Sequence, residues 1–132
     1  MSGLRSSDRG TVLLSSITRT VLVIGITCAV MFDAMSMTSA SVHVHDDAVT
    51  AAQLGNEAFR NSASQAAAIR AVESFVKTTP DRLVSIRVMT GDHHSIEVTL
   101  ERRAPTIVVG LIAPLRTYAL PRATVTGIDP VS

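Results

Sequence analysis

The chain has 132 residues, which is enough for one small domain and a membrane anchor. Only 17 % of its residues are charged and 3 % are aromatic, and its net charge is +1 with the basic residues scattered along the sequence. This composition excludes a basic nucleic-acid-binding surface and the aromatic platforms that stack on bases. Since soluble domains average about 25 % charged residues, the low value indicates an apolar segment hidden from water.

The most apolar segment is residues 20–37, in which Asp33 is the only charged residue. At a rise of about 1.5 Å per residue, a helix of this length nearly spans a hydrocarbon core of about 30 Å. Arginines precede the segment and aspartates follow it, so the positive-inside rule places the N-terminus in the cytoplasm. We therefore expect a single-pass protein of the cell membrane with a cytoplasmic head (1–19), a transmembrane helix (20–40) and an extracytoplasmic domain (41–132).

A secretory signal is the alternative interpretation of the same segment. Residues 21–32 form an apolar run of the length of a signal-peptide core, and residues 38–40 supply small side chains for a cleavage site. The preceding head of roughly twenty residues is long for a signal, which favours a retained anchor. Cleavage would instead release a secreted protein.

One face of the predicted anchor carries small residues. Gly25, Ala29 and Asp33 are spaced four residues apart, so they lie on the same side of a helix. Small residues allow membrane helices to approach closely, which makes this side a candidate helix-packing face. Gly and Ala are also common in any membrane helix, and Asp33 can simply mark the water boundary, so a plain tether is the alternative.

Two Ala-rich helices are predicted next. Residues 46–60 carry small or apolar side chains at spacings of three and four, which predicts an amphipathic helix that can continue the anchor. Residues 61–64 interrupt this pattern, and Ser64 is a suitable N-cap for a second helix. Pro80 stops that helix.

The sequence then changes from helical periodicity to alternation. Apolar and polar residues alternate over residues 84–89, with one side made up of Val84, Ile86 and Val88, and they alternate again over residues 96–101. Turn-forming residues 90–94 connect the two runs, which predicts a β-hairpin.

A third strand is expected over residues 118–127, where Pro121 indicates an edge position or a late start. The expected fold class is therefore α+β, with the membrane helix and the Ala-rich helices packed on a small antiparallel sheet of about three strands. Before this strand, residues 106–115 form an apolar run too short to cross a bilayer, so we expect a short buried helix or a packed loop. If exposed, the run offers a partner-facing apolar segment made up of Ile107, Val108, Val109, Leu111 and Ile112.

Histidines and acidic residues occur in two short clusters, at residues 43–47 and 92–94. These clusters can bind Zn²⁺ or Cu²⁺ only if the two segments meet in space, and otherwise they are solvated surface residues. The role of the four histidines, His43, His45, His93 and His94, is left open by the sequence.

Other catalytic patterns are missing from the sequence. It contains no nucleophile-elbow motif and no Gly-rich phosphate loop. Glu97 and Glu101 are expected to form surface salt bridges in register with Arg103 rather than an acid/base pair. We therefore expect a protein that is not an enzyme, with no cofactor, no metal and no small-molecule substrate.

The predicted parts follow one another in a particular order. A head containing Asp8-Arg9-Gly10 precedes one membrane helix, an Ala-rich helix and a Val-rich hairpin, and the apolar pattern of residues 98–115 leads into an Ala-Thr-Val-Thr strand at residues 123–126. This order resembles the actinobacterial TadE/TadG-like group, pilin-like membrane proteins encoded with tight-adherence (Tad) pilus machinery. The chain departs from that group at Ser15, the fifth residue after Gly10, where TadE-type proteins usually carry Glu.

The resemblance implies a structural or assembly role in a Tad-type pilus or secretion apparatus, without turnover chemistry. Pilin-like proteins keep an N-terminal helix in the membrane before assembly and pack it against neighbouring helices afterwards, while a small sheet faces outward. The implied partners are the membrane and other pilin-like or pilus-assembly proteins, and not nucleic acid. The alternative is a membrane-anchored or secreted cell-envelope binding protein that presents residues 107–112 to a ligand or partner.

Overall fold

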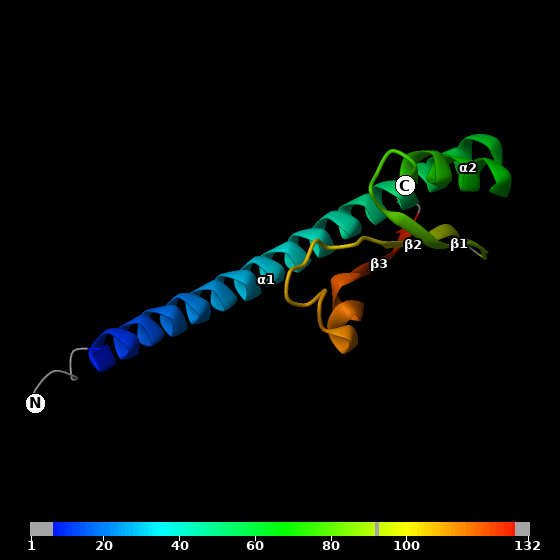
Figure 1. Cartoon of the computed structure of the whole chain (residues 1–132). Helices are drawn as coiled ribbons and strands as arrows, with labels where there is room; N and C mark the ends of the chain where they lie inside the picture. The colour runs from blue at the N-terminus through cyan, green and yellow to red at the C-terminus, as the bar shows by residue number, and fades with distance from the viewer. Residues whose placement is uncertain (1–6, 92, 129–132) are drawn as a thin grey trace, which may run out of the picture.

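The computed structural model describes residues 7–91 and 93–128 of the chain. These residues form, in order, α1 (Ser7–Ser62), α2 (Gln65–Val76), β1 (Arg82–Thr90), β2 (His94–Glu101), the 3-10 helix η1 (Ala113–Ala119) and β3 (Arg122–Ile128). The strands make one antiparallel sheet in the order β1-β2-β3 (Figure 1). The predicted α+β class and the three-stranded antiparallel sheet are confirmed.

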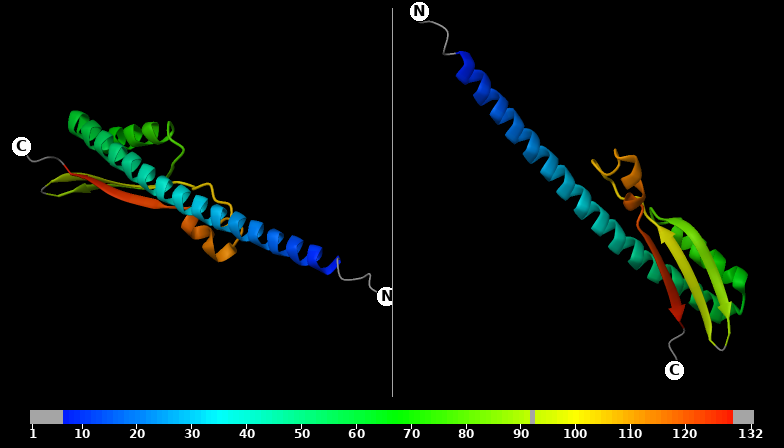
Figure 2. Two further views of the ribbon diagram at one scale, coloured as in Figure 1. Left: turned by 90° about the vertical axis from the view of Figure 1, so that its left-hand side faces the viewer. Right: turned by 90° about the horizontal axis from the view of Figure 1, so that it is seen from below.

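α1 is the longest element, with 56 residues, or about 84 Å at the usual helical rise. The sequence has no proline before Pro80, so nothing interrupts the backbone hydrogen bonds between the predicted anchor and the first Ala-rich helix. The helix ends where Ala63 takes a left-handed conformation, with φ at 51°. Its N-terminal half projects from the molecule, and its C-terminal half lies along the sheet (Figures 1 and 2).

α2 turns back after Ala63 and covers the end of α1. The side chain of Ser64 accepts a hydrogen bond from the backbone N–H of Ala67, which confirms the predicted N-cap. The buried side chains of α2 are Ala68, Val72 and Val76. They complete a core that includes Ala side chains of α1 and the inner face of the sheet.

Two glycines allow the layers of this core to approach each other closely. A Cβ on Gly127 of β3 would lie 2.8 Å from the backbone oxygen of Ala52 in α1. A Cβ on Gly55 of α1 would lie 2.8 Å from Cγ2 of Val72 in α2. The absence of a side chain at both points therefore sets the distance of α1 from β3 and from α2.

The first strand contains an irregularity that its sequence did not predict. The pairing of β1 with β2 shifts between Leu83 and Ser85, so Val84 is an extra residue. Leu83, not Val84, joins the partly buried residues packed on the core, and 44 % of Val84 is exposed. The prediction that Val84 shares the side of Ile86 and Val88 was wrong, because a bulge moves the residues before it to the opposite face.

The apolar run at residues 106–115 matches expectation only in part. Residues 106–112 form a loop whose backbone is held against α1, and residues 113–115 begin η1. Val108 and Val109 are half-buried, whereas Leu111 is 78 % exposed, so burial is wrong for the exposed side chains alone. The chain continues into β3 directly after Pro121, and β3 is an edge strand, as the proline indicated.

Replacing Gly127 with Ala should destabilise the fold by about 2 kcal/mol, because a new methyl group would collide with the α1 backbone, which cannot rotate away. Thermal unfolding of the full chain in detergent measures this loss. Gly91→Ala is the matched control, since a Cβ there meets nothing within 4 Å. Equal stability of the two variants would contradict the close contact between α1 and β3.

Candidate functional site

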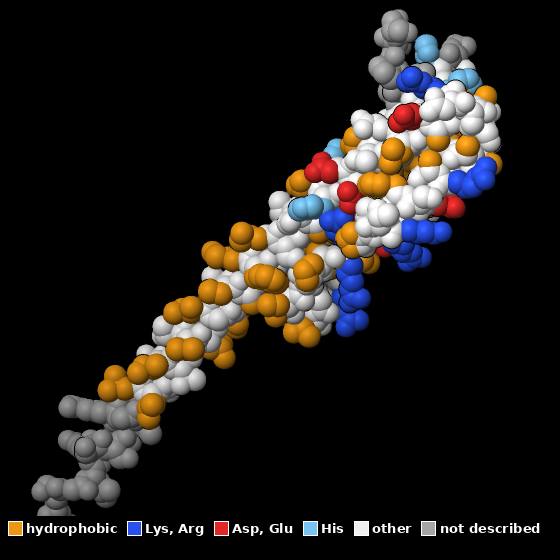
Figure 3. Space-filling model, turned by 90° about the horizontal axis from the view of Figure 1, so that it is seen from above, with side chains coloured by type: hydrophobic (Ala, Val, Ile, Leu, Met, Phe, Trp, Pro, Cys, Tyr) orange, Lys and Arg blue, Asp and Glu red, His pale blue; other side chains and the backbone are white. Residues whose placement is uncertain are grey.

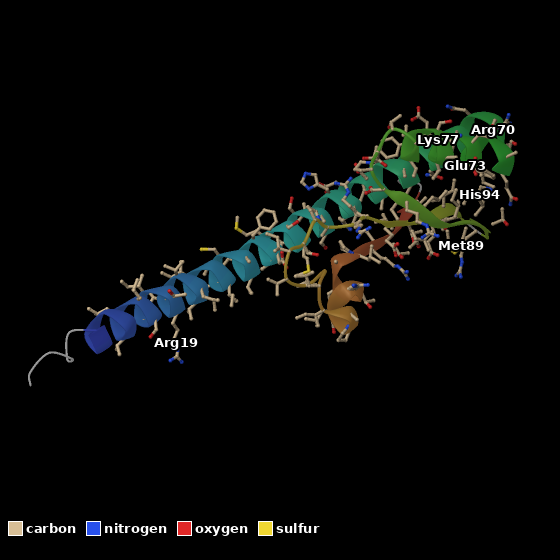
Figure 4. The ribbon with its side chains drawn as sticks, in the orientation of Figure 1. Arg19, Arg70, Glu73, Lys77, Met89 and His94 are labelled. Carbon is tan, nitrogen blue, oxygen red and sulfur yellow. The ribbon has the colours of Figure 1, made fainter. Side chains whose placement is uncertain are left out.

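The N-terminal part of α1 is apolar and uncovered. Between residues 12 and 32, Arg19 is the only charged residue, and it points away from the helix (Figure 4). We call residues 12–32 the bare segment. Its large apolar side chains are all exposed: Val12, Leu13, Leu14, Ile17, Val21, Leu22, Val23, Ile24, Ile26, Val30, Met31 and Phe32. Its length of about 30 Å matches a hydrocarbon core. α1 is therefore long and apolar enough to cross a membrane, and by its place in the chain it can be a membrane anchor or a signal sequence.

Directly after this bare segment, the carboxylate of Asp33 binds the backbone of the loop that precedes η1. Asp33 is 1 % exposed. Its oxygens accept three consecutive hydrogen bonds, from the N–H groups of Ile107 (2.5 Å), Val108 (2.7 Å) and Val109 (2.7 Å). Hydrogen bonds to a carboxylate are stronger than those between neutral groups, so three donors compensate for the burial of this charge.

Further contacts hold the same loop in a compact shape. One turn along α1 from Asp33, the hydroxyl of Ser36 donates to the carbonyl oxygen of Pro105 at 2.6 Å. Nε of Arg116 donates to the carbonyl oxygen of Gly110 at 3.1 Å. A Cβ on Gly110 would lie 2.9 Å from Oγ1 of Thr106, which shows how tightly the loop turns. Residues 105–110 are therefore fixed to α1 at two successive helical turns.

The predicted helix-packing face is continuous with the side of α1 that its own domain covers. Asp33 lies under the loop and Ala29 is half-buried, whereas a Cβ on Gly25 would meet nothing within 4 Å. Further along the helix, Ala40 and Val44 are buried. Asp33 thus has an intramolecular role that its spacing in the sequence did not reveal. Contact of Gly25 and Ala29 with another helix stays a prediction.

The structure brings together two sets of residues that the sequence singled out separately. In the predicted partner-facing segment, Ile107, Leu111 and Ile112 are exposed, while Val108 and Val109 are half-buried with their N–H groups on Asp33. The packing face and the apolar segment are therefore parts of one site. We call this site the Asp33 loop, meaning Asp33 together with residues 105–112.

A second polar cluster joins α1 to the open end of the hairpin, where β1 begins and β2 ends. Arg102 contacts Asp81 through Nε and Asp47 through a terminal guanidinium nitrogen, each at 2.5 Å. The Asp81 side chain is fully buried, and its Oδ2 has no hydrogen-bond partner among the described residues. Burial and the neighbouring Asp81 carboxyl raise the pKa of Asp47, and the hydrogen bond to Asp81 raises the pKa of Arg102.

The two histidine clusters do not meet. The His94 ring packs on Phe59, with centroids 5.0 Å apart, whereas His43 lies 16 residues earlier on α1, or about 24 Å along the helix. Within the described part of the chain, which omits Asp92, no three His, Cys, Asp or Glu side chains gather in a metal-binding arrangement. All four histidines are exposed: His43, His45, His93 and His94.

The strand glutamates form salt bridges, but with other partners than Arg103, and Glu101 is buried rather than on the surface. Glu97 pairs with Arg87 at 3.9 Å, and Glu101 pairs with Arg122 at 2.5 Å. Both partners lie directly opposite on neighbouring strands. The expectation of Arg103 was wrong because the nearest neighbours on a sheet face lie across the strands.

Replacing Asp33 with Ala should free the loop, since three backbone N–H groups lose their acceptor. Hydrogen exchange of the full chain in detergent should then be at least about tenfold faster at residues 107–109. Asp33→Asn should be intermediate, because one amide oxygen still accepts. Thr38→Ala is the matched control on the same helix, where the hydroxyl contacts only the carbonyl of Ala34. Unchanged exchange in Asp33→Ala would contradict the role of this carboxylate.

Asp47→Asn should stabilise the protein more at pH 7 than at pH 3.5. The pKa of Asp47 is raised from its ordinary 3.8, so its contribution to stability is full below that value and is lost as the pH rises through the folded pKa. An Asn removes the charge while its oxygen still accepts from Arg102. The thermal midpoint as a function of pH measures the difference, with exposed Asp46→Asn as control. A variant that is less stable than the parent by the same amount at both pH values would contradict the raised pKa.

Comparison with known proteins adds no relative. No family model, no curated protein and no solved structure matches this chain. A function must therefore be inferred from the bare segment of α1, the Asp33 loop and the sheet.

Proposed function

We propose that this chain is a non-enzymatic, pilin-like structural or assembly component of a Tad-type pilus or secretion apparatus. The observation that carries the proposal is the division of α1 into a bare apolar half and a half packed against an antiparallel sheet. A helix divided in this way can lie in a membrane before assembly. It can later pack against neighbouring helices while its sheet stays on the outside.

The composition of the bare segment supports this use of α1. Exposed aliphatic side chains surround it, and such a surface is stable only in lipid or against protein. Gly25 and the neighbouring turn at Ala29 offer a small-residue strip on which another helix can approach. Under this proposal Arg19 lies at the cytoplasmic boundary, residues 1–19 are inside and residues 41–132 are outside.

The polar sites also favour a structural role. The carboxylate of Asp33 accepts hydrogen bonds from backbone N–H groups of the chain itself, and the guanidinium of Arg102 forms ion pairs with Asp47 and Asp81. Both clusters join elements that are far apart in the sequence. Their geometry therefore favours a role in holding the outer domain on α1 over a role in chemistry.

The exposed side chains of the Asp33 loop support a second candidate, a cell-envelope binding protein that presents Ile107, Leu111 and Ile112 to a partner. The two candidates differ in the fate of α1. A pilin-like component needs the bare segment in the mature protein, whereas a binding protein functions equally well after signal cleavage.

Crosslinking between helices in native membranes tests the proposal. In a Cys28→Ser background, which removes the only cysteine, Ala29→Cys should crosslink to a second copy or to another pilin-like subunit. Its yield should exceed that of Met31→Cys several-fold, since Met31 lies on nearly the opposite side of the helix. Intact mass should show that residues 20–40 are retained.

Two controls make the result decisive. Gly25→Leu should lower the yield at Ala29→Cys by blocking close approach, whereas Ile24→Leu on another side should not. Equal yields at both cysteine positions would contradict packing through the small-residue face. A mature chain that begins after residue 40 would contradict the pilin-like proposal and favour the secreted binding protein.

A further inference from the structure

We infer that residues 106–120 form a second membrane contact, in which the loop and η1 insert into the outer leaflet beside α1. The partner of this surface is the lipid bilayer itself. The inference rests on α1 spanning the membrane, which is part of the proposed function, and it adds a lipid-binding role for the loop.

The segment carries large apolar side chains that the described structure leaves largely or partly exposed. Leu111 is 78 % exposed and Tyr118 is 71 % exposed. The complete exposed set is Ile107, Leu111, Ile112, Leu115, Tyr118 and Leu120. So many exposed apolar side chains within fifteen residues mark an interaction surface, because water does not stabilise them.

The position of the segment selects lipid as the partner. The loop and η1 project from the end of the sheet nearest to the bare segment and lie beside α1 (Figures 1 and 2). In Figure 3, hydrophobic side chains lie on both the bare segment and the projecting loop and η1, with Lys or Arg side chains beside them, whereas Asp, Glu and His side chains gather on the other half of the molecule. The apolar surface of the loop thus continues the surface of the membrane helix.

The depth of the segment is set by Asp33. If the span is residues 20–40, Asp33 lies about 10 Å below its outer end, and if the span is residues 12–32, Asp33 lies at the outer end itself. Interfacial segments bury their apolar side chains about 5–10 Å into the boundary of the bilayer. Either span therefore places the loop in the outer boundary region.

Part of the loop backbone is hydrogen-bonded within the chain, which lowers the cost of placing it in the boundary region of a membrane. Non-helical backbone is tolerated at membrane depth only where protein groups satisfy its N–H and C=O groups. Asp33 accepts the N–H groups of residues 107–109, and Ser36 donates to the carbonyl of Pro105. The N–H groups of Leu111 and Leu115 bind the carbonyls of Val108 and Ile112 at 3.1 Å and 2.9 Å.

The polar rim of the segment suits lipid headgroups. Arg103 and Arg116 are exposed on either side of the loop, where their long side chains can reach phosphates at the membrane surface. Tyr118 is the only tyrosine of the chain, and its amphipathic ring is of the type that concentrates at membrane interfaces.

A single tryptophan tests the inference directly, because the chain contains none. Leu111→Trp, Phe32→Trp and Met89→Trp are prepared in the full chain and reconstituted into phosphatidylcholine vesicles containing phosphatidylglycerol and brominated lipid. Phe32→Trp reports the bare segment, and Met89→Trp reports the hairpin tip far from it (Figure 4). We expect Leu111→Trp to be quenched at least half as strongly as Phe32→Trp, and Met89→Trp to be unquenched.

The alternative outcomes separate the loop from the anchor. Quenching of Phe32→Trp without quenching of Leu111→Trp would overturn the lipid contact and leave the membrane anchor intact. Quenching of neither would overturn the membrane span as well. A blue-shifted but unquenched Leu111→Trp would mean that a protein surface, such as a second copy, covers the loop, and this also overturns the inference.

A charge placed on the loop gives a second test. In a Tyr118→Trp background, Leu111→Asp should reduce quenching several-fold, because the charge keeps the loop out of the bilayer. Val84→Asp is the matched control, since Val84 is also exposed but lies on β1. Equal quenching in the two variants would overturn the insertion of the loop.

Discussion

The carboxylate of Asp33 connects the two halves of this protein. It lies on α1 at the point where the bare apolar segment ends and the packed half begins, and three backbone N–H groups of the loop converge on it. A buried charge at this position is costly without donors, and consecutive backbone N–H groups are costly without an acceptor wherever water is excluded. The carboxylate and the three N–H groups therefore offset each other's burial cost. Their hydrogen bonds hold the loop, and with it this end of the sheet, against α1.

A second constraint is that α1 serves two environments with one continuous backbone. Its bare segment carries Val, Leu and Ile in every direction, which suits lipid, whereas its packed half carries Ala48, Ala51, Ala52 and Gly55 against the sheet and α2. Small side chains bring the α1 backbone close to the sheet, and the larger side chains of Ile96, Val98 and Leu100 fill the core from the sheet side. Arg102 then connects this packed half to the hairpin, because it contacts Asp47 on α1 and Asp81 at the start of the hairpin.

Most local features of this fold were predictable from sequence, whereas the side-chain contacts between distant segments were not. Periodicity predicted the hairpin and both helices, and Ser64 predicted the start of α2, because each signal lies within one element. The bulge at Val84 left no trace in an alternating pattern. The partners of Asp33 lie 74 to 76 residues away, and the pairing of Glu101 with Arg122 depends on the register of β3. The site could be predicted as two separate sets of residues but not as one.

Under the proposed function, the presence of both sets of residues in one site changes what assembly would require. Gly25 and Ala29 lie on the side of α1 that leads to the Asp33 loop, so a helix that packs there would run toward the exposed side chains of residues 107–112. Lipid and a neighbouring subunit would then compete for one continuous surface. Transfer of α1 from membrane to filament would be favourable only if protein contacts replaced lipid on both the bare segment and the loop. The loop would thereby couple the position of the outer domain to the environment of the helix.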